Sequence, residues 1–128
     1  MIPSLSEPVG RHLLADLYGM DPARLRDESW LAEVFRAALA RAGFNAIRAT
    51  SHKFPGAASG VTAVALLSES HASLHTYPEH EYVAIDVFSC GRPDPHDVVD
   101  LLIDALEPQH VERHLQTRGA RCATEPRR

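Results

Sequence analysis

Residues 81–90 carry the most regular pattern in the chain, in which two kinds of side chain alternate along the segment. Val83, Ile85 and Val87 would all point to one side of an extended strand, because successive side chains of a strand face opposite ways. This pattern predicts a β-strand with one fully apolar face and one mixed face. The positions of the mixed face are Tyr82, Ala84, Asp86, Phe88 and Cys90.

Other segments also have the composition of strands, with short apolar and β-branched runs between turn residues. A loop is expected over residues 55–60, a run of Pro, Gly, Ala and Ser that follows the predicted strand 45–54. The predicted strands cover residues 10–18, 45–54, 61–69, 71–77 and 109–118.

Two helices are predicted between these strands. Asp21 and Asp27 are suited to cap helix N-termini, and apolar residues recur at helical spacing over residues 31–42. Asp94 opens the second helix, followed by a proline in the first turn, and Pro108 ends it.

Helices separated by alternating strands predict an α+β fold, a two-layer sandwich in which two main helices pack on one face of a mostly antiparallel sheet. The other sheet face then needs a cover, which a second subunit or an active site could supply. We expect one domain over residues 1–128, because the chain has the length of one domain and contains no linker or repeat.

Charge and hydropathy exclude several classes of protein. The formal net charge of −4 argues against nucleic acid as a partner, because phosphate binding needs clustered Lys and Arg. The chain has neither an apolar run long enough to cross a membrane nor a secretory leader, so no membrane partner is expected. Cys90 and Cys122 lie in very different contexts, which argues against a disulfide framework and fits a cytoplasmic location.

The histidines do not predict a metal site. His71 and His75 are four residues apart, as are His110 and His114, and both pairs lie in predicted strands. Four residues along a strand span about 13 Å, too far for two ligands of one zinc ion. A serine protease is not supported either, because the nucleophile elbow G-x-S-x-G is absent.

Three residues with reactive side chains remain, and each also has a plain structural interpretation. Ser70 could be a serine at a strand edge that bonds to the backbone, and His75 could be a structural imidazole. Cys90, taken alone, could be a small buried residue without chemistry. Their joint occurrence with particular neighbours favours chemistry instead.

The neighbours of these residues match, in order and nearly in spacing, the pattern of a known family. The chain resembles the small pyruvoyl-dependent S-adenosylmethionine decarboxylases of prokaryotes, which are made as proenzymes. The looser part of the resemblance covers residues 10–13 and 51–54. The matching motifs are Gly60-Val61-Thr62, Ser68-Glu69-Ser70-His71, His75-Thr76-Tyr77-Pro78-Glu79 and Asp86-Val87-Phe88-Ser89-Cys90-Gly91.

The resemblance implies that the chain cuts itself between Glu69 and Ser70 into a β chain of residues 1–69 and an α chain of residues 70–128. The Ser70 hydroxyl would attack the preceding carbonyl to form an ester, and β-elimination would then leave a pyruvoyl cofactor at this position. His75 would be the base for the elimination, a task that suits an imidazole. Thr62 stands where the family has a serine that assists processing.

The resemblance also implies roles in decarboxylation. The pyruvoyl carbonyl would form a Schiff base with the amine of the substrate and act as the electron sink. Cys90 would donate a proton to the resulting carbanion. Phe54 would stack on adenine and Glu79 would bind the ribose hydroxyls. The loop over residues 55–59 is about two residues longer than the family pattern, which affects the placement of Phe54.

The implied reaction is decarboxylation of S-adenosylmethionine to the aminopropyl donor for spermidine synthesis. The alternative is a pyruvoyl-dependent decarboxylase of another amino acid, arginine or ornithine, and a non-catalytic homologue is a third possibility. Ser70, His75 and Cys90 are all present, which argues against the third. The resemblance further implies a homodimer with active sites near the subunit interface, without a metal ion or a diamine activator.

Overall fold

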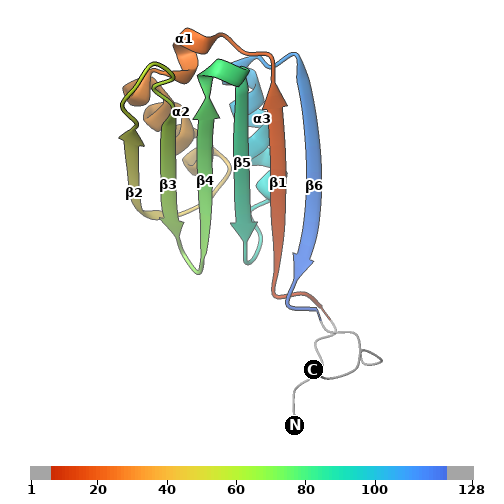
Figure 1. Ribbon diagram of the computed structural model, residues 1–128. Coiled ribbons are helices and arrows are strands. Elements are labelled where there is room, and N and C mark those ends of the chain that lie inside the picture. Colours follow the sequence, from red (N-terminus) through yellow and green to blue (C-terminus); the bar gives the residue numbers. More distant parts are fainter. Residues whose placement is uncertain (1–6, 121–128) are drawn as a thin grey trace, which may run out of the picture.

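The computed structural model describes residues 7–120 of the chain, and Cys122 lies outside this range. Six strands form one antiparallel sheet in the order β2-β3-β4-β5-β1-β6 (Figure 1). The strands are β1 (Gly10–Tyr18), β2 (Ala46–Lys53), β3 (Val61–Leu67), β4 (Ser70–Tyr77), β5 (Tyr82–Ser89) and β6 (His110–Arg118). The helices are α1 (Pro22–Leu25), α2 (Glu28–Arg41) and α3 (Pro95–Leu106), with the 3-10 helix η1 at Pro78–His80.

The helices begin at the aspartates that the sequence indicated. Asp21, Asp27 and Asp94 each accept a hydrogen bond from a backbone N–H of the first turn, which pairs a donor that the helix leaves free. The helices α2 and α3 lie side by side on the same face of the sheet (Figure 1). The predicted α+β sandwich with two main helices on one face is confirmed.

The core lies between the helices and the sheet. Every second side chain of β5 is buried there, so the alternation in the sequence corresponds to the two faces of this strand. Residues of α2 and α3 at helical spacing complete the layer. The largest fully buried side chains are Phe35, Leu13, Leu17, Leu25, Leu31, Leu39, Leu67, Leu74, Leu102, Leu106, Val61 and Val83.

The other face of the sheet, here called the open face, has no covering layer among residues 7–120 (Figure 1). Leu14, Val64 and Leu66 are exposed there to 44%, 40% and 53%. Beside them, Tyr77 and Tyr82 stack with ring centroids 5.5 Å apart, and Tyr18 stacks on Tyr82 at 5.2 Å. Exposed apolar side chains that gather on one face make it a candidate binding surface.

The structure differs from the prediction in several element bounds and in having the short α1 as a separate helix, and two differences have a clear physical reason. The strand predicted over residues 61–69 ends at Leu67, because Ser68 and Glu69 form the turn of the hairpin that leads into β4. The 3-10 helix η1 was not predicted, since three residues are too few for a periodic pattern. Within residues 7–120, no helix has the length and apolar character needed to cross a membrane.

Candidate active site

The turn between β3 and β4 has a strained backbone at the predicted cleavage point. Leu67 and Ser70 pair across the hairpin, so Ser68 and Glu69 are its two central residues. Glu69 has a φ of 57°, in the left-handed region where such turns usually have Gly or Asn. This conformation costs a side-chain-bearing residue on the order of 1 kcal/mol. The strain lies directly before the Glu69–Ser70 peptide bond.

Ser70 and Cys90 line the same cavity, which has a volume of about 190 Å³. Ser70 begins β4 and Cys90 follows the end of the neighbouring strand β5, so the sheet brings them to the same end. The Ser70 hydroxyl donates a 3.3 Å hydrogen bond to the Ser68 carbonyl. The turn after Cys90 is held by Ser89, whose hydroxyl donates to the Pro93 carbonyl at 2.6 Å.

The other predicted site residues line a second cavity of about 340 Å³. Thr62 and His75 face each other across β3 and β4, and Thr62 Oγ1 lies 3.0 Å from His75 Nδ1. Phe54, which is half exposed, follows β2. Its ring contacts that of His52 edge-on, with the ring centroids 4.7 Å apart. Glu79, on η1, closes this group of four.

The two cavities lie at different ends of β4. Ser70 and His75 are five positions apart on this strand, which corresponds to about 16 Å. Their side chains also point to opposite faces, because His75 lies on the open face and Ser70 alternates with it. The His75 imidazole of one chain therefore does not reach the Ser70 hydroxyl of the same chain.

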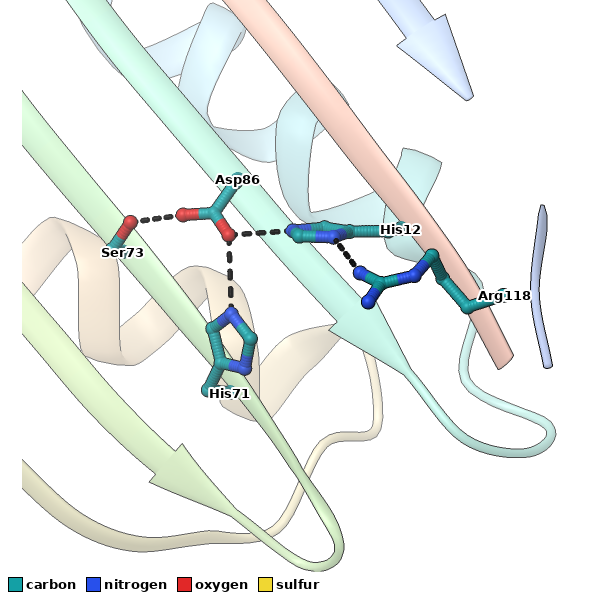
Figure 2. Close-up of polar contacts among 5 residues, drawn as sticks. All are labelled: His12, His71, Ser73, Asp86 and Arg118. Atoms are coloured by element: carbon teal, nitrogen blue, oxygen red, sulfur yellow. Dashed lines mark hydrogen bonds and ion pairs between the residues drawn. The ribbon is translucent and has the colours of Figure 1, made fainter. Parts of the chain in front are cut away.

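A third group of polar side chains connects the strands β4, β5, β1 and β6 (Figure 2). Asp86 Oδ2 lies 2.7 Å from His12 Nε2 and 3.2 Å from His71 Nε2, and Ser73 Oγ donates to Asp86 Oδ1. Arg118 donates to His12 Nδ1 at 3.1 Å, so His12 carries its proton on Nε2 and donates it to Asp86. We call these five residues the Asp86 network.

The Asp86 network contains the donor set of many metal sites, two imidazoles and a carboxylate within 4.8 Å of one another. A metal-bound imidazole, however, donates a hydrogen bond from its other ring nitrogen. In His12 that nitrogen instead accepts from Arg118. This arrangement favours a hydrogen-bonded network over a metal centre. The sequence did not indicate it, because His12 and Asp86 are 74 residues apart and meet only through strand pairing.

The network stabilises the ionised form of Asp86. Burial alone would raise the pKa of this carboxyl, but the hydrogen bonds from Ser73 and His12 and the nearby His71 imidazole lower it below its ordinary value of 3.8. A depressed folded-state pKa contributes stability that is present above pH 3.8 and is lost as the pH falls through the folded-state value.

The variant Asp86→Asn should therefore be destabilised in a pH-dependent way. At pH 7 we expect its free energy of unfolding to fall by about 1–3 kcal/mol, because charge-assisted hydrogen bonds are lost. The difference from the unsubstituted protein should shrink at pH values below 3.8. Urea unfolding at pH 7 and at pH 3 measures both quantities. An equal loss at the two pH values would contradict the assignment of the charge to Asp86.

Comparisons with known proteins show which family the chain belongs to. The family model described as S-adenosylmethionine decarboxylase matches residues 11–119. An arginine decarboxylase proenzyme of Ignicoccus hospitalis is 42% identical over 113 residues, which cover 88% of this chain and 78% of that protein. An S-adenosylmethionine decarboxylase proenzyme of Bacillus velezensis is 39% identical over 113 residues, covering 88% of each chain.

A solved structure has the same fold. The crystal structure of the adenosylmethionine decarboxylase from Aquifex aeolicus superposes with a TM-score of 0.82 and 31% sequence identity, covering 95% of this chain and all of that one. The structural match covers 95% of the chain, and the sequence match covers residues 11–119. The chain belongs to the S-adenosylmethionine decarboxylase family.

Proposed function

We propose that this protein is a self-processing decarboxylase of S-adenosylmethionine whose pyruvoyl cofactor forms from Ser70. The observation that carries this proposal is the hairpin turn, where strained Glu69 precedes Ser70 and Ser70 shares a cavity with Cys90. Cleavage at this bond releases the backbone of Glu69 from its left-handed conformation, so the fold favours breaking the chain at this bond.

Processing uses the Ser70 hydroxyl as the nucleophile. Its oxygen attacks the Glu69 carbonyl carbon, the peptide C–N bond breaks, and Glu69 and Ser70 are then joined through an ester. A base next removes the Ser70 Cα proton, and the Glu69 carboxylate leaves from Cβ. Addition of water and loss of ammonia give the pyruvoyl group at the start of the chain of residues 70–128. This chemistry is supported by the local structure, because the Ser70 hydroxyl follows directly after Glu69, whose backbone is strained.

The base comes from a second copy of the chain in our proposal. One protomer holds Ser70 and Cys90 at one end of β4 and holds Thr62 and His75 near the other end. In a dimer whose two sheets stack by their open faces, with the two-fold axis running across the strands, each end of one sheet lies over the opposite end of the other. The His75 imidazole of one chain then faces the Ser70 backbone of the other, and the proton that it removes is on the backbone Cα. The exposed apolar side chains of the open face support such a homodimer.

In the assembled site, Thr62 orients the His75 imidazole through the contact at Nδ1. This leaves Nε2 as the nitrogen that takes the Ser70 Cα proton during processing. Thr62 retains the hydroxyl needed for this contact, and its extra methyl group restricts the rotamer.

In decarboxylation, the cofactor and the residues of the two cavities have different roles. The pyruvoyl group supplies the electron sink for loss of carbon dioxide from an α-amino acid. Phe54 and Glu79 bind the nucleoside part of the substrate, through the aromatic face and through hydrogen bonds to the ribose hydroxyls. Cys90 delivers a proton to the substrate carbon that loses the carboxylate. The product is the aminopropyl donor for spermidine synthesis.

A second candidate substrate is arginine, because the relative from Ignicoccus hospitalis carries that name. The second cavity suits both substrates. Phe54 and Glu79 can hold the adenine and the ribose hydroxyls of the nucleoside, but a guanidinium can also stack on an aromatic ring and pair with a carboxylate, so the choice falls to experiment.

Release of labelled carbon dioxide from carboxyl-labelled S-adenosylmethionine, arginine and ornithine tests this choice. We expect turnover of S-adenosylmethionine at least a hundred times faster than of either amino acid, without stimulation by magnesium or putrescine. The Ser70→Ala variant is the matched blank, since it lacks the source of the cofactor. Release from arginine alone would assign the protein to the other activity.

A further inference from the structure

The loop between Phe54 and Gly60 forms one wall of the second cavity, to which Ala58 and Gly60 contribute. The two ends of the loop are joined, because the Phe54 N–H donates to the Gly60 carbonyl at 2.9 Å. Inside it, the Ser59 hydroxyl donates to the Gly56 carbonyl at 2.6 Å. Most of the loop is exposed, so these internal bonds give it a shape but do not fix it against the protein.

Arg26 provides a contact that fixes the loop against the rest of the protein. Its Nε donates a hydrogen bond of 3.1 Å to the carbonyl of Ala58, across 32 residues of sequence. The contact is partly buried, and Ala58, which accepts the hydrogen bond, is itself one of the residues that line the cavity. A charged donor makes a stronger hydrogen bond than a neutral one.

The position of Arg26 is itself fixed by the core. The preceding residue, Leu25, is fully buried, and its carbonyl accepts a 2.6 Å hydrogen bond from Thr76 Oγ1. The same Thr76 oxygen accepts the Val61 N–H at 2.9 Å. The backbone next to Arg26 is therefore held against β3 and β4, the strands that carry Thr62 and His75.

We infer that Arg26 is a positioning residue that holds the loop of residues 55–60 over the nucleoside-binding cavity and thereby sets the affinity for substrate. The inference rests on the proposed function, since it assigns the cavity to the nucleoside. Without the bond to Ala58 the loop samples open positions, and binding has to close it first. The Arg26 side chain bonds to the loop and not to Ser70, His75 or Cys90, so the chemical steps stay intact.

Steady-state kinetics of Arg26→Ala with S-adenosylmethionine tests the inference. We expect KM to rise about five- to tenfold, the effect of losing one hydrogen bond of typical net strength, while kcat changes less than twofold. Self-cleavage, measured by intact mass, should be as complete as in the unsubstituted protein. Arg26→Lys keeps a charged donor on a flexible stem, so its KM should lie between the two.

Arg41→Ala is the matched control, because Arg41 is an exposed arginine at the C-terminal end of α2. Its KM should equal that of the unsubstituted protein. An unchanged KM in Arg26→Ala, or a fall in kcat as large as the rise in KM, would overturn the inference while leaving the decarboxylase assignment in place.

Calorimetric binding of 5′-methylthioadenosine separates the inference from the proposed function. This nucleoside carries the adenine and ribose groups but has no carboxylate to lose. If the unsubstituted protein releases no carbon dioxide from S-adenosylmethionine, the proposed function fails. The loop inference then still requires that Arg26→Ala binds the nucleoside about five- to tenfold more weakly than the unsubstituted protein. Equal binding by the two proteins, or no binding by the unsubstituted protein, overturns it.

Discussion

Two inactive variants, Ser70→Ala and His75→Ala, should form an active enzyme when they are expressed together. In a mixed dimer, the His75→Ala chain supplies Ser70 and Cys90, and the Ser70→Ala chain supplies Thr62 and His75. One of the two sites is then complete. We expect each mixed dimer to have about half the activity of the unsubstituted dimer. Either variant alone should have an activity at least a hundredfold below that of the unsubstituted dimer.

The physical reason is the length and alternation of β4. Five residues of extended chain separate Ser70 from His75 by about 16 Å, and their side chains leave opposite faces of the sheet. A rotamer change moves an imidazole by only a few ångströms. A rigid sheet that is paired on both sides of β4 does not bend to close the remaining distance.

Tags of different mass on the two chains make the result specific. The His75→Ala chain should be cut in the mixture and the Ser70→Ala chain should remain whole. Co-expression of Ser70→Ala with a chain that carries both substitutions is the control, and it should give no cleavage. Failure of the His75→Ala chain to be cut in the mixture would contradict the shared site.

The variant Cys90→Ala should separate processing from decarboxylation. We expect normal cleavage at Glu69–Ser70, because the attack and the elimination use Ser70 and His75. Decarboxylation should fall by about a hundred- to ten-thousandfold, the range for loss of a positioned proton donor. Cleavage is read from intact mass and turnover from carbon dioxide release, so one preparation gives both measurements.

The position of Cys90 supports this expectation. It lines the same cavity as Ser70, and the turn that follows it is held by Ser89. Cys90→Ala removes the thiol without adding bulk, so the cavity keeps its other walls. Cys122→Ala, which changes the other cysteine of the chain, is the matched control. Loss of cleavage in Cys90→Ala, or retention of full turnover, would contradict the role as proton donor.

The sequence predicted those parts of the fold that local patterns encode. The alternation in residues 81–90 assigned the faces of β5, because the side-chain period of a strand is two. Aspartates at three chain positions marked the helix starts, because an N-cap is a local interaction. The grouping of Thr62 with His75 follows from the hairpin that joins two adjacent predicted strands.

Long-range pairing accounts for what the sequence did not predict. The Asp86 network depends on the pairing of β1 with β5, and no local pattern specifies which strands become neighbours. The separation of Ser70 from His75, by contrast, was available from the sequence. The strand spacing that excluded a zinc site at His71 and His75 also places these two residues too far apart to act within one chain.

Intact-mass spectrometry of the purified protein under denaturing conditions, beside Ser70→Ala, tests the central claim most directly. We predict two fragments that divide between Glu69 and Ser70, the second starting with a pyruvoyl group in place of an amine. Ser70→Ala should give one full-length mass. A single full-length mass for the unsubstituted protein, equal to that of an intact chain with a free Ser70, would contradict self-processing and with it the proposed source of the cofactor.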